Sequence, residues 1–158
     1  QKYSGKNMYY IDPVTNEKYT PTVIEYSIGA DRLMLAVLTE AYNEEVLEGG
    51  DTRVVMKFHP AIAPYKVAIL PLQKNINEKA LELYRQLSKK FMCMYDESGS
   101  IGKRYRRQDE IGVPYCVTID FDTLEDNTVT IRDRDTMEQI RIPMSEVEKY
   151  IEERIQFN

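Results

Sequence analysis

The chain has 158 residues, enough for one ordinary domain or for two smaller units. Hydrophobic residues make up 42 % and charged residues 30 %, a balance typical of a globular protein with a packed core. The net charge of −5 argues against a general cationic coat for nucleic acid, although not against a local basic patch.

The first third of the chain predicts a hairpin followed by a helix. Residues 7–27 contain two extended runs, "NMYYI" and "YTPTVIEYSI", around the turn-forming "DPVTNEK". Pro13 and Pro21 argue against a helix interior there. From Asp31 the apolar residues recur at helical spacing, and Gly49-Gly50 is expected to end that helix. Two strands alone hold together poorly, so residues 1–50 are expected to complete a larger sheet.

From residue 65 onward, strands and helices alternate. The expected strands are 65–72, 92–96, 113–120, 127–135 and 138–143, and the expected helices are 77–91, 100–112 and one that starts at Ser145 in an S-x-x-E capping box. The run "YKVAILPL" is too apolar for a one-sided strand, which predicts a central strand with both faces covered. The order predicts an α/β fold: a three-layer domain over 65–158 with a mixed, largely parallel sheet and flanking helices. Residues 51–64, rich in Pro, are interpreted as a linker.

Polar residues interrupt the stretch "TPTVIEYSIGADRLMLAVL" in an unusual way. A glutamate, Glu25, ends an apolar run, which is costly unless a cation meets it. Arg32 falls in the first turn of the next helix, shortly after Gly29, where a ligand can approach the backbone closely. Helix capping around Asp31 explains part of this pattern. A pocket for a ligand with an ammonium at one end and a phosphate at the other explains more of it.

A second charged stretch, "SIGKRYRRQDEIG", has two interpretations. It is either a solvated helix face balanced by Asp109 and Glu110, or a phosphate anchor aided by backbone N–H groups at the helix start. Tyr105 inside the basic run suits stacking on a base of single-stranded RNA. The alternating "RDRD" of residues 132–135 is more often cross-strand ion pairing than a binding site.

Several kinds of site are not expected. His59, the one histidine, precedes a proline in the expected linker and is interpreted as structural or exposed. With a single histidine and no Ser or Cys in a nucleophile context, a hydrolase triad is excluded. No Asp, Glu, His or Cys cluster has metal-site spacing. Cys93 and Cys116 lie in apolar runs without CxxC spacing, which favours reduced core thiols. The sequence has no long apolar run and no signal-peptide pattern. We therefore expect a cytoplasmic location and no membrane partner.

These stretches resemble a known family. "VIEYSIGADRLMLAVL" is similar to motif 3 of class II aminoacyl-tRNA synthetases, the strand and helix that end their catalytic domain. Together with "IAPYKVAILPL" and "YDESGSIGKRYRRQDEIGVPYCVTIDFDTLEDNTVTIRDRDTMEQIRI", it closely resembles the glycyl-tRNA synthetases of the homodimeric type over essentially the whole chain. Motifs 1 and 2 of the class have no counterpart here. The resemblance therefore implies a C-terminal fragment: the end of the catalytic domain (1–50), a linker (51–64) and the anticodon-binding domain (65–158).

The resemblance also implies roles for individual residues. Arg32 matches the catalytic motif 3 arginine that binds the ATP phosphates, and Gly29 belongs to the turn that presents it. Glu25 matches the glutamate that takes the amino group of glycine, with Ser27 beside it. The candidates for contacts to the tRNA anticodon arm are Ser100, Lys103, Arg104, Tyr105, Arg107, Arg132 and Arg134.

The function implied is that of a glycine–tRNA ligase. The parent enzyme is expected to be a homodimer that activates glycine with ATP and Mg2+ and transfers it to tRNA(Gly), with no role for DNA. The fragment alone is expected to be inactive and to hold no cofactor or metal. The alternative is a non-catalytic synthetase-like RNA-binding protein or polymerase accessory protein. Such a protein would not need Glu25, Ser27 and Arg32 together, which favours the enzyme.

Overall fold

The computed structural model describes residues 2–157. Its backbone contacts divide the chain into two compact units, and the boundary in the sequence falls between Leu33 and Met34. In the part of the chain that is described, no helix is both long and apolar enough to cross a membrane.

The first unit contains a short hairpin. Strands β1 (Tyr10–Ile11) and β2 (Lys18–Tyr19) pair antiparallel. Asp12 closes the turn by accepting hydrogen bonds from the backbone N–H groups of Val14 and Thr15, at 2.8 and 3.0 Å. The predicted turn is thereby confirmed. The long strand expected through residue 27 is wrong: residues 20–29 have no regular structure, because a strand needs a partner, and β1 and β2 pair only with each other among residues 2–33.

Helix α1 (Ala30–Ala41) is shorter than the sequence predicts. The chain turns at its end into strand β3 (Tyr42–Val46), which pairs antiparallel with β4 (Thr52–Met56). Gly49 and Gly50 form the tip of this hairpin with φ of +106° and +88°, values that glycine adopts without steric cost. The two glycines therefore end a strand instead of a helix.

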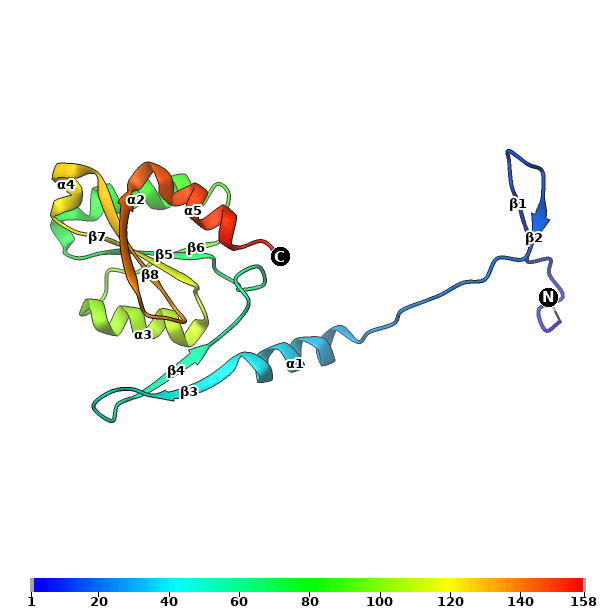
Figure 1. The fold of residues 1–158 in the computed structure, drawn as a ribbon, viewed down its shortest axis with the longest axis horizontal. Helices are drawn as coiled ribbons and strands as arrows, with labels where there is room; N and C mark the ends of the chain where they lie inside the picture. Colours follow the sequence, from blue (N-terminus) through cyan, green and yellow to red (C-terminus); the bar gives the residue numbers. More distant parts are fainter. Residues whose placement is uncertain (1, 158) are drawn as a thin grey trace. The chain divides into compact units, whose positions relative to one another are not determined.

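The second unit is built on a five-stranded sheet (Figure 1). Its strands are β5 (Val67–Pro71), β6 (Cys93–Tyr95), β7 (Tyr115–Ile119), β8 (Thr128–Asp133) and β9 (Gln139–Pro143). In the order β6-β5-β7-β8-β9, the first three strands run parallel, and β8 and β9 each run antiparallel to their predecessor. The predicted mixed sheet is confirmed, and so is the central strand, since every residue of β5 is buried.

Helices cover both faces of the sheet (Figure 1). They are η1 (Lys74–Ile76), α2 (Asn77–Leu87), α3 (Ile101–Ile111), α4 (Asp122–Asp126), η2 (Met144–Glu146) and α5 (Val147–Arg154). Helices α2 and α5 pack on the face that holds Val67, Ile69 and Val117. Helix α3 packs on the opposite face, against Ala68, Leu70 and Cys116.

One further helix was missed by the sequence analysis, and two further sequence predictions have clear outcomes. Helix α4 was not predicted, and its five residues are too few for a periodic pattern. The capping box at Ser145 is wrong, because a 3-10 turn precedes α5 and its N-cap, Glu146, makes no side-chain capping hydrogen bond. The prediction of core thiols is confirmed: Cys93 and Cys116 are free and buried, and burial raises the pKa of Cys116 to about 12.

The β3–β4 hairpin packs closely on the end of α3. Gly112 ends that helix with φ of +81°, and its N–H donates to the carbonyl of Asp109 at 3.1 Å. A Cβ atom at Gly112 would lie 2.5 Å from Cδ2 of Phe58 and 2.8 Å from the carbonyl oxygen of Met56. Residues 51–64, interpreted from sequence as a linker, thus contain a strand and part of a packed core, including the buried Val55 and Phe58.

Replacing Gly112 by Ala should destabilise the 158-residue chain by about 2–4 kcal/mol, because the new methyl group meets both an unfavourable φ and the hairpin backbone. Urea unfolding followed by circular dichroism measures the change. The matched control is Gly102→Ala on the same helix, where a Cβ meets nothing within 4 Å. That variant should gain up to about 1 kcal/mol from helix propensity. Equal stability of the two variants would contradict close packing at Gly112.

Candidate functional site

The carboxyl ends of the three parallel strands meet at one edge of the sheet. Strand β5 leads into α2 on one face, whereas β6 leads into α3 on the other face. In open α/β sheets such a reversal leaves a crevice at the carboxyl ends of the strands, where ligands usually bind. The segments that follow β5, β6 and β7 at this edge are 72–74, 96–100 and 120–121.

Two of the predicted anticodon residues shape the loop after β6. Arg104 is 4 % exposed and donates to the carbonyl of Gly99 through Nε and Nη2, at 3.1 and 2.8 Å, and to the carbonyl of Pro71 through Nη1. Arg107 donates to both carboxylate oxygens of Asp96 at 2.7–3.0 Å. Both guanidinium groups therefore hold the loop in place through bonds within the chain.

Two other candidates lie on the surface beside this loop. Ser100 is the N-cap of α3, and its side chain makes no capping hydrogen bond. Ser100 and Lys103 are both exposed. The first-turn N–H groups of α3 and the Lys103 ammonium together form a local positive environment that suits a phosphate.

Tyr105 and Arg132 contact each other. The Arg132 guanidinium carbon lies 4.8 Å from the centre of the Tyr105 ring, and the Tyr105 hydroxyl is 2.6 Å from Oγ1 of Thr118. Burial raises the pKa of Tyr105, so its hydroxyl keeps its proton. Arg132 is 6 % exposed and bound to Asp109. Arg132 is therefore buried in contact with both the Tyr105 ring and the Asp109 carboxylate.

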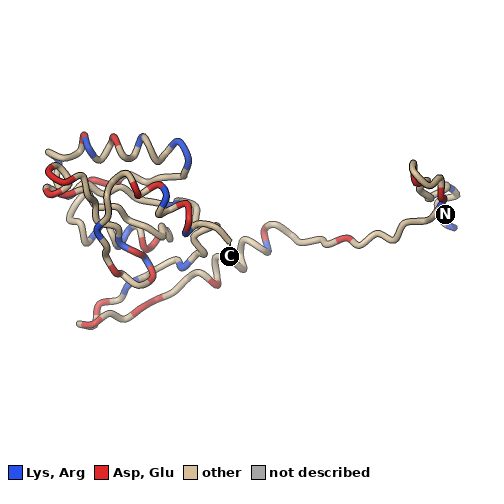
Figure 2. The backbone as a smooth tube through the Cα atoms, turned by 45° about the horizontal axis from the view of Figure 1, so that its top comes forward, with Lys and Arg blue, Asp and Glu red and all other residues tan. Residues whose placement is uncertain are grey.

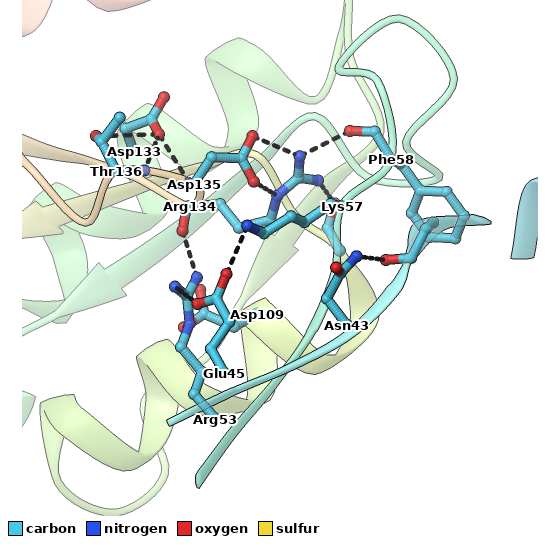
Figure 3. Close-up of polar contacts among 12 residues, drawn as sticks. Asn43, Glu45, Arg53, Lys57, Phe58, Asp109, Asp133, Arg134, Asp135 and Thr136 are labelled. Carbon is cyan, nitrogen blue, oxygen red and sulfur yellow. Dashed lines mark hydrogen bonds and ion pairs between the residues drawn. The ribbon is translucent and has the colours of Figure 1, made fainter. Parts of the chain in front are cut away.

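Arg134 is held inside the protein. It is 2 % exposed, and its guanidinium donates to the carbonyls of Gly112 and Phe58, at 3.0 and 2.7 Å, and to the carboxylate of Asp135 at 2.8 Å (Figure 3). Arg132 on β8 and Arg134 in the turn after it are therefore both buried and ion-paired instead of exposed. The expected cross-strand pairing is wrong, because Arg132 pairs with Asp109 on α3 and Arg134 pairs with the adjacent Asp135.

Sequence reasoning missed a polar face on the sheet. Cross-strand partners share a face of the sheet. Thr118 on β7 lies opposite Thr130 on β8, and Thr130 and Arg132 on β8 lie opposite Arg141 and Gln139 on β9, so a polar face runs from β7 to β9. We call this the polar sheet face; its residues are Thr118, Thr128, Thr130, Gln139 and Arg141. The signal in the sequence that could have identified this face is the alternation of its residues with Val129, Ile131 and Ile142, which face the core.

Arg141 is fixed over this face by Asp120. Its Nη1 and Nη2 atoms donate to the Asp120 carboxylate at 2.7 and 3.1 Å, and its Nε donates to Oγ1 of Thr128 at 2.6 Å. The hydrogen bond from Arg141, with smaller effects from Thr123, lowers the pKa of Asp120 to about 2. The next residue, Phe121, precedes α4 and is 44 % exposed, so an aromatic ring is open to solvent just after β7.

Charge does not gather into one basic face in the second unit. Acidic and basic positions are interspersed along its helices and strands (Figure 2). Any polyanion would therefore be met at local points such as Lys103 and Arg141, instead of by a broad cationic surface.

The motif 3 candidates belong to the first unit and are all exposed. Ser27 donates a hydrogen bond to Glu25 at 3.0 Å. The carbonyl of Gly29 accepts the N–H of Leu33 at 3.0 Å, which places Arg32 in the first turn of α1. Within residues 2–157, no group of three or more His, Cys, Asp or Glu side chains could hold a metal ion. The Arg32 guanidinium is suited to phosphate oxygens, with which it can form paired hydrogen bonds.

Comparison with known proteins adds three findings. Residues 66–154 match the family described as "Anticodon binding domain". The chain is 65 % identical to the glycine–tRNA ligase of Clostridium beijerinckii over 157 residues, which are 99 % of this chain and 34 % of the relative. The corresponding enzyme of Clostridium tetani is 63 % identical over 155 residues, again 34 % of the relative. The chain therefore spans about a third of the length of the curated relatives that it matches.

Solved structures share the fold. The histidyl-tRNA synthetase from Nostoc sp. PCC 7120 superposes with a TM-score of 0.56 at 21 % identity, over 59 % of this chain and 23 % of that chain. The RNA binding domain of threonyl-tRNA synthetase from Cryptosporidium parvum Iowa II gives 0.54 at 23 % identity, over 58 % and 24 %. At these identities the likeness establishes the fold alone.

Replacing Arg141 by Met should return the pKa of Asp120 from about 2 toward its ordinary value of about 3.9. Since the folded-state pKa is depressed, the pair contributes stability above about pH 4, and that contribution is lost as the pH falls toward 2. Carboxyl-carbon NMR titration measures the pKa. The exposed Arg85→Met on α2 is the control and should leave it unchanged. A value still near 2 in Arg141→Met would assign the shift to Thr123.

Proposed function

Because the chain belongs to the family of anticodon binding domains, we propose that residues 66–154 bind the anticodon arm of a tRNA and that the chain is a segment of a glycine–tRNA ligase. The observation that carries the proposal is its extensive identity with such ligases along nearly its full length. The parent enzyme would be a cytoplasmic homodimer that activates glycine with ATP and Mg2+ and transfers it to tRNA(Gly).

The proposed RNA contacts lie at the carboxyl edge of the sheet and on the polar sheet face. The start of α3 with Ser100 and Lys103 takes a backbone phosphate. The hydroxyl, amide and guanidinium groups of the polar sheet face are suited to the edges of unstacked bases, and Phe121 offers a ring on which a base can stack. Arg104 and Arg107 support this surface by holding the loop between them.

The proposed roles in catalysis fall on the first unit. Glu25, with Ser27 hydrogen-bonded to it, takes the ammonium of glycine, which compensates the carboxylate charge. Arg32 binds the phosphates of ATP and stabilises the negative charge that develops during adenylyl transfer, and Gly29 leaves room for the nucleotide. When bound, Mg2+ would neutralise phosphate charge. The chain by itself is expected to form no glycyl-adenylate, since it has no counterpart of motif 2.

The alternative is a non-catalytic synthetase-like RNA-binding or polymerase accessory protein. It would use the same second unit, but it would have no need of an amine-binding carboxylate and a phosphate-binding arginine. The presence of Glu25, Ser27 and Arg32 within eight positions of the chain favours the ligase.

Lys103→Ala should weaken binding of the chain to a tRNA(Gly) transcript and reduce the slope of log affinity against log salt by about one, because one phosphate contact is lost. Fluorescence anisotropy at several salt concentrations measures both quantities. Lys89→Ala, which removes an exposed charge just beyond α2 on the other face of the sheet, is the matched control and should change neither. If the unchanged chain bound a tRNA with altered anticodon bases equally well, anticodon recognition would be excluded.

Arg32→Ala in the full-length ligase should lower glycine-dependent ATP–pyrophosphate exchange by about 10²–10³-fold, since it removes stabilisation of developing charge. Arg32→Lys should fall in between, because an ammonium keeps the charge without the paired donors. Binding of tRNA should be the same in the unchanged ligase and in both variants. Equal binding would show that the variants are folded and that only their catalytic activity is lower. An unchanged exchange rate would remove Arg32 from the proposed site.

A further inference from the structure

A buried ionic cluster joins the β3–β4 hairpin to the second unit's sheet. We call it the Asp109 cluster; it consists of Asp109 with Arg53, Arg132 and Glu45. Asp109, on α3, is fully buried, and Arg53 on β4 and Arg132 on β8 are 1 % and 6 % exposed. The three side chains come from elements far apart in the sequence.

Both oxygens of the Asp109 carboxylate are engaged. Oδ1 accepts from Nη1 of Arg132 at 2.9 Å. Oδ2 accepts from Nε of Arg53 at 2.9 Å and from Nη2 of Arg132 at 3.1 Å. Burial disfavours the charged form of Arg132, but its hydrogen bonds and ion pair with Asp109 outweigh this and raise its pKa. The two arginines thus fix the carboxylate in one orientation.

Arg53 uses its whole guanidinium group in this cluster (Figure 3). Besides Asp109, it donates through Nη1 to Glu45 at 2.9 Å and through Nη2 to the backbone carbonyl of Arg134. Glu45 is also bound by Lys57 at 2.5 Å, and that hydrogen bond together with the charge of Arg53 lowers the pKa of Glu45. With 1 % exposure and every nitrogen occupied, Arg53 has no group left with which to contact an RNA.

A continuous series of contacts leads from Arg53 to the polar sheet face. Asp109 holds Arg132, the Arg132 guanidinium lies 4.8 Å from the Tyr105 ring centre, and the Tyr105 hydroxyl bonds to Thr118 at 2.6 Å. Thr118 itself belongs to the polar sheet face, where it lies directly opposite Thr130. Arg53 therefore stands at one end of the series, and the surface proposed to meet the bases stands at the other.

We propose that Arg53 is a positioning residue for RNA recognition: it orients Asp109, which holds Arg132 and Tyr105 in place beside the exposed residues of the polar sheet face. This inference rests on the proposed function. Without Arg53, one of the two partners that orient the carboxylate is lost, and Arg132 is free to change its position under the ring. The effect falls on the geometry of base contacts and leaves the phosphate contact at Lys103 intact.

The test compares tRNA(Gly) with a transcript carrying altered anticodon bases, using the complete chain. Arg53→Lys keeps the charge but not the fork of donors. It should lower the ratio of the two affinities about ten-fold, the size of one well-placed base contact, and leave the salt slope unchanged. A purely structural role would weaken both transcripts equally. Arg85→Lys, the same change at an exposed arginine on α2 outside the cluster, is the control and should keep the ratio.

A second variant keeps the test decisive if Arg53→Lys fails to fold. Tyr105→Phe removes only the hydroxyl at the far end of the series and should lower the ratio in the same way. In the double variant the two losses should not multiply, because both changes act through one series of contacts. A folded Arg53→Lys with an unchanged ratio, an unchanged ratio in Tyr105→Phe, or fully multiplicative losses would each overturn the inference.

The outcomes also separate this inference from the proposal on which it rests. If the unchanged chain distinguishes the two transcripts and the variants do so equally well, anticodon recognition stands and the role of Arg53 falls. If the unchanged chain does not distinguish them, both fall together.

Discussion

The second unit depends on one carboxylate that has no contact with water. Asp109 is fully buried, and a buried charge is tolerated only when opposite charges and hydrogen bonds satisfy it. Its two partners, Arg53 and Arg132, come from the hairpin and from an antiparallel strand of the sheet. Breaking such a pair by removing one partner is costlier than never having formed it. The ion pairs of Asp109 therefore fix the positions of the hairpin, α3 and β8 relative to one another.

The other buried arginines are also satisfied by acceptors within the chain. Arg104 and Arg134 bind backbone carbonyls at the ends of a strand and of a helix, groups that are left without partners by the regular structure. Arginine suits this task because its planar group offers several donors at once and stays charged. As a result, Arg53, Arg104, Arg132 and Arg134 stabilise the fold through contacts within the chain.

The sheet was predictable, and the hairpin was not. The apolar run of β5 and the strict alternation in β8 and β9 each allow one interpretation. Tyr42 and Val46, in contrast, lie four residues apart, a spacing that fits both a helix face and one side of a strand. What decides for the strand is its pairing with residues beyond Gly50, which no local pattern reveals. Likewise, a local run of charge cannot show that Arg104 points inward while Lys103 points to solvent.

The hairpin also explains why the packed unit begins before the predicted linker. The last carbonyl of α1, that of Ala41, accepts hydrogen bonds from the N–H of Lys57 and the side chain of Asn43, at 2.6 and 3.0 Å. Ala41 itself packs with Phe58, whose ring would collide with any side chain at position 112. The end of α1 is thus packed against the chain that follows β4. A glycine pair marks the tip of a hairpin here, and the compact unit starts upstream of it, at Met34.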